Sequence, residues 1–491
     1  MGTPRILMEQ FAEGMKLLTE SSESTMSKTG IGKDLVGYLK NDVEPAIARE
    51  GQQLMRTINP QTGVLHPPDE AIKLAREKVF NAAFGKNRVG LMPVLAGIKA
   101  QGGDIHAAHV ADALNVFLKD ENKAIPWRSY VANKLKIPIK ISSAYTSPSE
   151  KGLERTVKSV SSRMFLPLIS IPHAFQAPLN SLLINGWGDT LRALIDFSGD
   201  LQGAKKLALD SGALTQDLVQ EHLNAMRKTS MFNRLLDPLR GVFSLERRLG
   251  IQFSAVGGKW SAIRAAQEFA QTGSKRAELQ LKLLGLDPAL VQATRGVLSQ
   301  QDIEKAAFRA ASEIMGMRSP LETPYMWEQN AMARLTTLYK HYGFRQARLI
   351  KDALKRGWQG EGVIGAAKIM TALGLAFPIA GELIKGAEGA VTLKNPWTAE
   401  RKKQNLAGNE YLDAFANAGG FGMMYSITRA ARHNHLGGYL MGPHISTAAD
   451  LAQDVMNLRG KSVARDVLRR MGLPGRALSD IIVPPKKKES E

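Results

Sequence analysis

The chain has 491 residues, no cysteine and a formal net charge of +19, and 44% of its residues are hydrophobic. The lack of cysteine excludes disulfide scaffolds, thiolate zinc sites and cysteine nucleophiles, and the hydrophobic content excludes wholesale disorder. The positive charge favours a polyanionic partner, either nucleic acid or an anionic membrane surface, over a basic surface that serves only solubility.

Residues 1–150 are predicted to form an N-terminal helical region. Apolar residues at helical spacing predict a helix over 7–20, and the pattern continues with helices over 70–83 and 105–119. A stretch rich in proline and glycine at 53–70 predicts a linker or an ordered loop between them.

A second helical region is predicted over 151–320. It contains a charge-free run at 164–188, which approaches the ~20 residues that a membrane helix requires. Prolines inside the run, among them Pro172 and Pro178, each remove a backbone hydrogen bond. We therefore expect short helical or extended pieces that are buried in protein, in preference to a membrane span.

Helix boundaries are marked clearly near 285–302. Gly285 is predicted to end one helix, and Asp287 followed by Pro288 is an N-cap with a first-turn proline. Ser299 and Asp302 have the spacing of a capping box.

The strongest helix prediction covers 324–356, with Gly357 as its end. Projected at ~100° per residue, the apolar residues gather on one arc and the basic residues on the other. The predicted polyanion-binding arc consists of Arg334, Lys340, Arg345, Arg348, Lys351, Lys355 and Arg356. Two interpretations stay open: a solvated face of a bundle helix, or a helix that lies on anionic lipid or along nucleic-acid phosphates.

The last part of the chain is rich in glycine and alanine. Residues 363–392 are apolar but interrupted by Pro378, which indicates either a buried helix or an interfacial hairpin. Residues 411–458 contain glycine pairs that let helices approach closely. The predicted close-packing glycines are Gly419, Gly420, Gly437, Gly438 and Gly442.

Two strands joined by a helical crossover never occur in the pattern, so the predicted fold class is all-α. We expect a multi-helix protein, extended or bundle-like, with short apolar Gly/Ala-rich helices near the C-terminus. Residues 321–491 would form its third region, composed of the basic amphipathic helix, the apolar hairpin and the glycine-rich module.

Motifs for catalysis and cofactor binding are not recognised. The segment Gly30–Lys33 resembles a phosphate loop, but Ser27 replaces its first glycine and Asp34 its magnesium-binding hydroxyl, so a turn is predicted there. His433, His435 and His444 have neither cysteines nor a His-Glu-x-x-His helix beside them and are interpreted as surface or capping residues. We therefore predict no catalytic residues, no cofactor and no metal, and a protein that is not an enzyme.

Several segments from about 155 to 485 resemble the C-terminal helical region of large phage virion-associated proteins of the polyvalent or internal-virion type. The segments are Phe175–Asn180 with Gly186, Phe243–Arg248 with Ala255–Gly258, Pro324–Arg348, and Ala418–Gly422 with Gly437-Gly438 and Gly442-Pro443. The resemblance implies an all-helical component of a phage particle that accompanies or enables genome delivery. Residues 1–150 show no lysozyme, protease or polymerase module, so a structural role is expected.

The first functional hypothesis is a phage internal virion protein that assists genome ejection through contact with a membrane or DNA. Its expected partners are other virion proteins, further copies of itself, phage DNA and an anionic host membrane. Its expected location is the virion, and the host cell envelope during infection. The alternative is a sequence-independent DNA-binding structural protein of the particle.

Overall fold

The computed structural model describes residues 29–60, 62–85, 89–118, 175–215, 231–316, 340–392 and 414. Within these ranges the chain is helical and has no strand, apart from an isolated bridge between Ile58 and Leu65. The all-α prediction is confirmed for this part of the chain.

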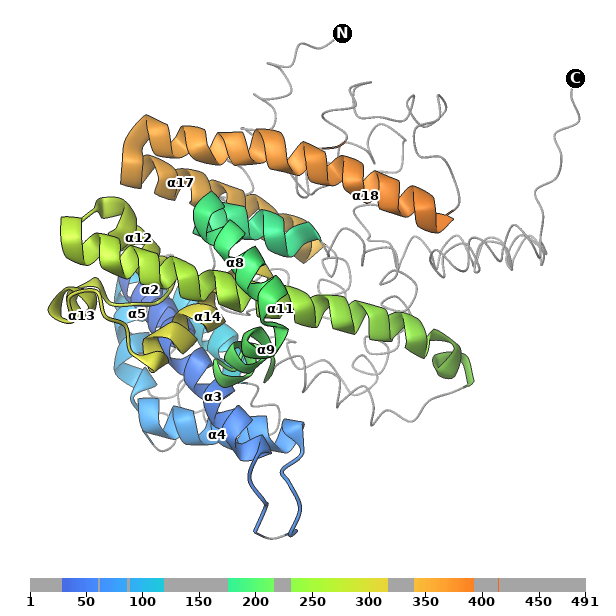
Figure 1. Ribbon diagram of the computed structural model, residues 1–491. Helices are drawn as coiled ribbons and strands as arrows, with labels where there is room; N and C mark the ends of the chain where they lie inside the picture. Colours follow the sequence, from blue (N-terminus) through green and yellow to red (C-terminus); the bar gives the residue numbers. More distant parts are fainter. Residues whose placement is uncertain are drawn as a thin grey trace, which may run out of the picture.

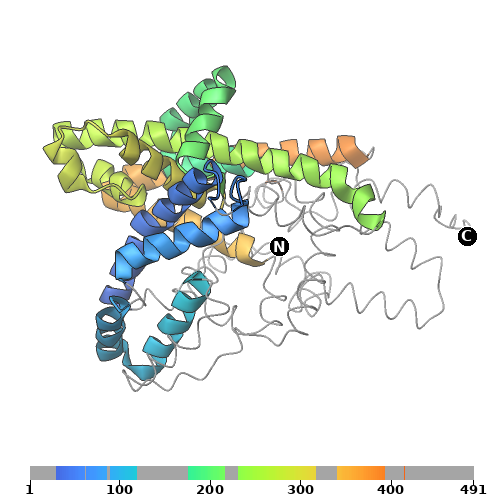
Figure 2. The same cartoon turned by 90° about the horizontal axis from the view of Figure 1, so that it is seen from below.

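The long helix α11 (Met231–Thr272) is the centre of the structure, and five shorter helices pack around it (Figure 1). The five are α8 (Trp187–Gly199), α9 (Leu201–Asp210), α12 (Lys275–Leu283), α13 (Pro288–Ala293) and α14 (Gln300–Ile314). Viewed from below, the blue N-terminal helices lie on one side of α11 and the green α8 on the other (Figure 2). The main core consists of side chains from α11 and the helices that surround it, together with side chains from residues 177–184 and 349–380.

The helices before residue 119 share a hydrophobic cluster of their own. They are α2 (Gly30–Tyr38), the π-helical turn η2 (Leu39–Val43), α3 (Glu44–Met55), α4 (Pro68–Phe84) and α5 (Leu91–Leu118). Phe80, Leu95 and Leu114 are fully buried in this cluster. A smaller cluster, which joins Ala48 of α3 to Ile251 of α11 and Phe308 of α14, connects it to the central helices.

Several local predictions are confirmed. Asp287 caps α13 by accepting a hydrogen bond from the backbone N–H of Ala289, with Pro288 in the first turn. Ser299 and Asp302 form the expected capping box of α14. Gly285 follows the end of α12 with φ 75°, the left-handed conformation that favours glycine.

The predicted N-terminal helices are found with shifted boundaries. The helix predicted at 70–83 is α4, and the loop predicted at 53–70 lies between Met55 and Pro68. The helix predicted at 105–119 is the second part of α5, which is interrupted at Gly103, where φ is 80°. The sequence interpretation missed the part before this break.

Three local predictions are wrong. Gly30–Lys33 is not a turn, because Thr29 caps α2 by accepting from the N–H of Gly32. Gly357 does not end the basic helix: α17 (Lys340–Thr371) continues to a break at Gly362, where φ is 64° and ψ is −139°. Pro378 does not interrupt the apolar stretch, because the π-helical turn η4 (Ala372–Ala376) leads directly into α18 (Phe377–Thr392).

The described part of the charge-free run is a helix at 175–185, which ends at Gly186 with φ 81°. Leu179, Leu183 and Ile184 are buried in the main core, as expected for a segment buried in protein. The helix predicted at 7–20, the glycine-rich segment at 411–458 except Ala414, and the proposed region boundaries near 150 and 320 lie outside the described residues.

Candidate functional site

One side of the helical hairpin formed by α17, η4 and α18 exposes large apolar side chains to solvent. The chain reverses direction at Gly362, and the apolar segment after this break returns along the basic helix before it. The two arms are drawn in the orange part of Figure 1. We call the following set the apolar face: Trp358, Val363, Ile364, Met370, Leu375, Ile379 and Leu383, each at least 48% exposed.

The opposite side of the same apolar segment is buried. Leu373 and Phe377 belong to the main core together with Ile350 of α17. The close approach of the two arms depends on glycine: a Cβ at Gly357 would lie 2.8 Å from the carbonyl oxygen of Gly365. The segment therefore has one face against the protein and one face open.

A π-helical turn explains how the apolar segment stays helical through Pro378. A proline inside an α-helix clashes with the carbonyl of the preceding turn, and a wider turn is one way to accommodate it. Here η4 comes immediately before Phe377 and Pro378. The sequence interpretation therefore underestimated the length of the continuous apolar surface.

The stretch Arg345–Gly386 includes an 18-residue window with a mean hydropathy of 1.8, of which 33% is buried. By length and composition alone this window could cross a membrane. Such windows also occur in the cores of soluble proteins, but there they are mostly buried, whereas only a third of this one is.

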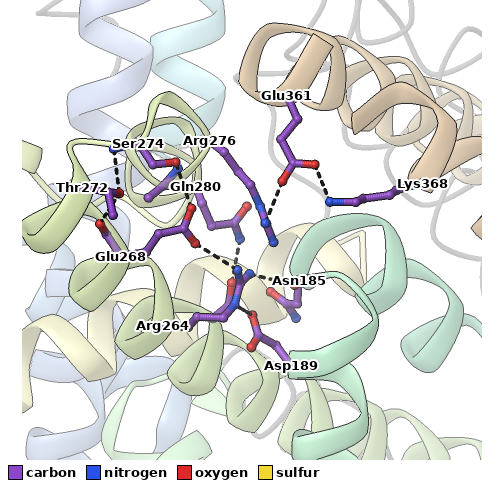
Figure 3. Close-up of polar contacts among 12 residues, drawn as sticks. Asn185, Asp189, Arg264, Glu268, Thr272, Ser274, Arg276, Gln280, Glu361 and Lys368 are labelled. Carbon is purple, nitrogen blue, oxygen red and sulfur yellow. Dashed lines mark hydrogen bonds and ion pairs between the residues drawn. The ribbon is translucent and has the colours of Figure 1, made fainter. Parts of the chain in front are cut away.

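A polar clamp holds the hairpin near its turn. Glu361 accepts from Arg276 of α12 at 2.7 Å through one carboxylate oxygen and from Lys368 at 2.6 Å through the other (Figure 3). Burial alone would raise the pKa of Glu361, but the two cations outweigh it and lower the pKa below its ordinary value. The clamp thus joins both arms of the hairpin to the central helices.

A second polar network connects α8, α11 and α12 near the clamp. Arg264 donates to the buried carboxylate of Asp189 at 2.8 Å and to Glu268 at 3.4 Å (Figure 3). Burial raises the pKa of Asp189, and Arg264 only partly opposes this effect. Glu268 also accepts from Ser274, the N-cap of α12. This network positions α12 and therefore Arg276.

Replacing Glu361 by glutamine is expected to loosen the turn and leave the overall stability nearly unchanged. Both cations are well exposed to solvent, so the loss in free energy of unfolding should stay below about 1 kcal/mol. Backbone amides of residues 357–371 should exchange faster with deuterium. Because the pKa is lowered in the folded state, wild-type exchange should approach that of the variant as the pH falls below the ordinary glutamate pKa. Unchanged exchange at neutral pH would show that the clamp does not hold the turn.

The predicted basic arc is divided between two environments. Lys351 and Lys355 are exposed on α17. Arg345, Arg348 and Arg356 are only partly exposed. Arg356 donates to the carbonyl of Leu183 at 3.4 Å, and burial lowers its pKa. Of the five side chains of this arc that the structure describes, two are therefore open to solvent and three are partly covered by the rest of the protein.

Arg348 and Arg356 are close enough to Glu313, near the end of α14, to interact with it electrostatically. This carboxylate accepts from Lys40 of η2 at 2.9 Å and from Arg309 at 3.1 Å. Burial alone would raise the pKa of Glu313, but Lys40, Arg309 and the more distant Arg348 outweigh it, and the pKa is lowered. We call Lys40, Arg309 and Glu313 the ionic junction, because it joins the N-terminal helices to the central ones.

Other predicted site residues are not placed. Arg334 and the glycines Gly419, Gly420, Gly437, Gly438 and Gly442 lie outside the described residues, and of Lys340 only the backbone is described.

Close packing through glycine is nevertheless found elsewhere, between Gly357 and Gly365 and where Gly381 lies against Ala414. The sequence interpretation missed both contacts. The first of them forms only because the chain reverses at Gly362, and a helical projection of the sequence does not show this reversal.

No group of three or more histidine or acidic side chains suited to hold a metal ion occurs among the described residues. His433, His435 and His444 lie beyond them. Comparisons with protein-family models, with curated proteins and with solved structures gave no match.

Proposed function

We propose that this chain is a structural protein of a phage particle that assists genome delivery by contacting the host membrane. The observation that carries the proposal is the exposed apolar face of the α17–α18 hairpin on a chain with a formal net charge of +19. Several large apolar side chains exposed along one element are typical of a binding surface, and positive charge favours anionic lipid.

Two further considerations support this function. The resemblance to internal virion proteins implies a helical component that accompanies the genome. The exposed lysines of α17, Lys351 and Lys355, belong to the same hairpin as the apolar face. Its partners would be other virion proteins and further copies of the chain, and its location the virion and then the host envelope.

Vesicle flotation tests the membrane contact. The full chain is expected to float with vesicles that contain phosphatidylglycerol, and to float less with pure phosphatidylcholine, because anionic lipid attracts the basic chain. Raising the salt concentration should weaken the binding without abolishing it, since the apolar contribution is not screened. Absence of flotation with anionic vesicles at low salt would contradict the proposed membrane contact.

The alternative is a structural protein that binds DNA without sequence preference, which the net charge and the exposed Lys351 and Lys355 favour. It predicts an affinity for duplex DNA that falls steeply with salt. Reversing both charges, Lys351→Glu with Lys355→Glu, should then weaken DNA binding and lower its salt dependence, and leave part of the vesicle binding. DNA binding that is unaffected by these substitutions would exclude the exposed lysines as its site.

A further inference from the structure

The apolar face follows the hairpin from Trp358 to Leu383, and its geometry limits how a bilayer could receive it. We infer that the α17–α18 hairpin binds an anionic bilayer lengthwise, with α18 in the plane of the interface and not across the membrane. This inference rests on the proposed membrane contact and specifies its geometry.

The apolar segment has two unlike faces. Leu375 of η4 and Ile379 and Leu383 of α18 repeat every four residues, so they follow one side of this continuous helix, and each is more than half exposed. Phe377, Ala380 and Ile384 are buried on the other side. A helix with one apolar open face and one face held by protein suits the interface plane, whereas a spanning helix would have to leave its protein contacts.

The positions of the charged residues also disfavour a spanning orientation. Lys368 and Glu382 lie within the apolar segment, paired with Glu361 and Lys385. In a spanning orientation these groups would enter the hydrocarbon, where charged side chains are costly. In the interface plane their charged ends can remain in the headgroup region.

The charges beside the apolar face indicate its occupant. Lys351 and Lys355 are exposed on α17, seven and three residues before Trp358, so the three side chains share one side of the helix. The two lysines complement an anionic lipid surface. At the turn, Trp358 is 60% exposed, and tryptophan is enriched where membrane and water meet. Exposed lysines, a tryptophan at the turn and an apolar helix are together typical of an anchor that lies in the membrane interface.

Depth measurements distinguish the possible orientations. Because the chain has no cysteine, single-cysteine variants can be labelled without further changes. We would attach a fluorophore at Ile364→Cys, Leu375→Cys or Leu383→Cys and quench it with spin labels at known depths in phosphatidylglycerol vesicles. The reference is Lys205→Cys on α9, an exposed position far from the hairpin in the sequence.

The lengthwise orientation predicts similar, shallow depths at all three hairpin positions and no quenching at position 205. Positions 364 and 383 are separated by roughly 28 Å along a helix, close to the ~30 Å thickness of the hydrocarbon core. If the segment spanned the bilayer, position 375 would therefore lie deepest. If the hairpin inserted with its turn first, the depth would decrease from position 364 to position 383. Either result would overturn the inference.

A paired substitution tests whether the face itself binds. Leu375→Glu with Ile379→Glu should weaken partitioning to anionic vesicles by at least about tenfold, with an unchanged circular dichroism spectrum. The matched control is Leu191→Glu with Ile195→Glu on α8, which are similarly exposed but lie outside the hairpin. We expect the control to bind as the wild type does.

The outcomes separate the inference from the function on which it rests. If the wild type does not float, the membrane contact is wrong. If it floats and the hairpin variant floats equally well, the contact stands and the inference is wrong. If sedimentation without lipid shows self-association that only the hairpin variant abolishes, a second copy of the chain occupies the face, which also overturns the inference.

Discussion

Replacing Glu313 by glutamine is expected to lower the free energy of unfolding by about 3 kcal/mol, the size typical of breaking a buried ion pair. The side chains of Lys40 and Arg309 are only 9% and 7% exposed, and both donate to the same oxygen of Glu313. The Nε and Nη1 atoms of Arg309 are buried without a hydrogen-bond partner, so this guanidinium has no replacement for the lost carboxylate. Urea unfolding, followed by circular dichroism, measures the change.

The matched control is Glu278→Gln, which removes the same charge from a carboxylate on α12 whose cationic partners, Lys275 and Lys282, are 59% and 56% exposed. Hydrogen bonds from Lys275 and Lys282 lower the pKa of Glu278 to about 2, yet these ion pairs lie at the surface, where solvent screens them. Glu278→Gln should therefore leave the unfolding midpoint nearly unchanged. Equal effects of the two substitutions would show that the ionic junction contributes no more to the free energy of unfolding than a surface ion pair does.

The effect of Glu313 should depend on pH in a defined direction. Its pKa is lowered in the folded state, so its contribution is complete above the unfolded glutamate pKa of about 4.3 and is lost as the pH falls. The difference in stability between the wild type and Glu313→Gln should accordingly shrink below about pH 4. A difference that stays constant down to pH 3 would contradict this assignment.

Replacing Gly258 by alanine is expected to lower the free energy of unfolding by about 2 kcal/mol through overpacking. Gly258 lies where α11 crosses α14, and a Cβ there would be 2.5 Å from the Cβ of Ala310 and 2.8 Å from the carbonyl oxygen of Ala306. Backbone atoms cannot rotate away as the end of a flexible side chain could, so the two helices must separate. Chemical unfolding measures the loss.

Gly188 provides the control for this substitution, because it also lies in a helix but has no atom within 4 Å of the added Cβ. Gly188→Ala should be neutral or stabilise the protein by up to about 1 kcal/mol, since alanine has the higher helix propensity. If Gly258→Ala were equally harmless, the close crossing of α11 and α14 would not be required for stability.

Helix capping was predictable because it is local. The caps of α13 and α14 depend on residues two or three positions apart, and the structure has both as expected. The apolar arc of the basic helix was predictable for a similar reason: Leu349, Ile350 and Ala353 are buried together. Periodicity identifies such a face without any knowledge of the partner.

The direction of the basic arc could not be predicted in the same way. Arg348 and Arg356 interact electrostatically with Glu313, which belongs to a different helix and is brought near only by the fold. Helical projection shows that basic residues share a side but not that an acidic residue faces them. The end at Gly357 was wrong for a related reason, since this glycine serves the contact with Gly365 and not a helix terminus.

The ionic junction can form only late in the synthesis of the chain. Lys40 and Glu313 are 273 residues apart in the chain. At about 5–20 residues per second, a ribosome completes Glu313 roughly 14 to 55 s after Lys40. During this interval the N-terminal helices can assemble their own cluster, but the small cluster that Ala48 shares with Phe308 is incomplete, and Lys40 lacks the carboxylate of Glu313. A nascent chain that stops before α14 therefore presents an unfinished surface, which is the kind of surface that chaperones bind.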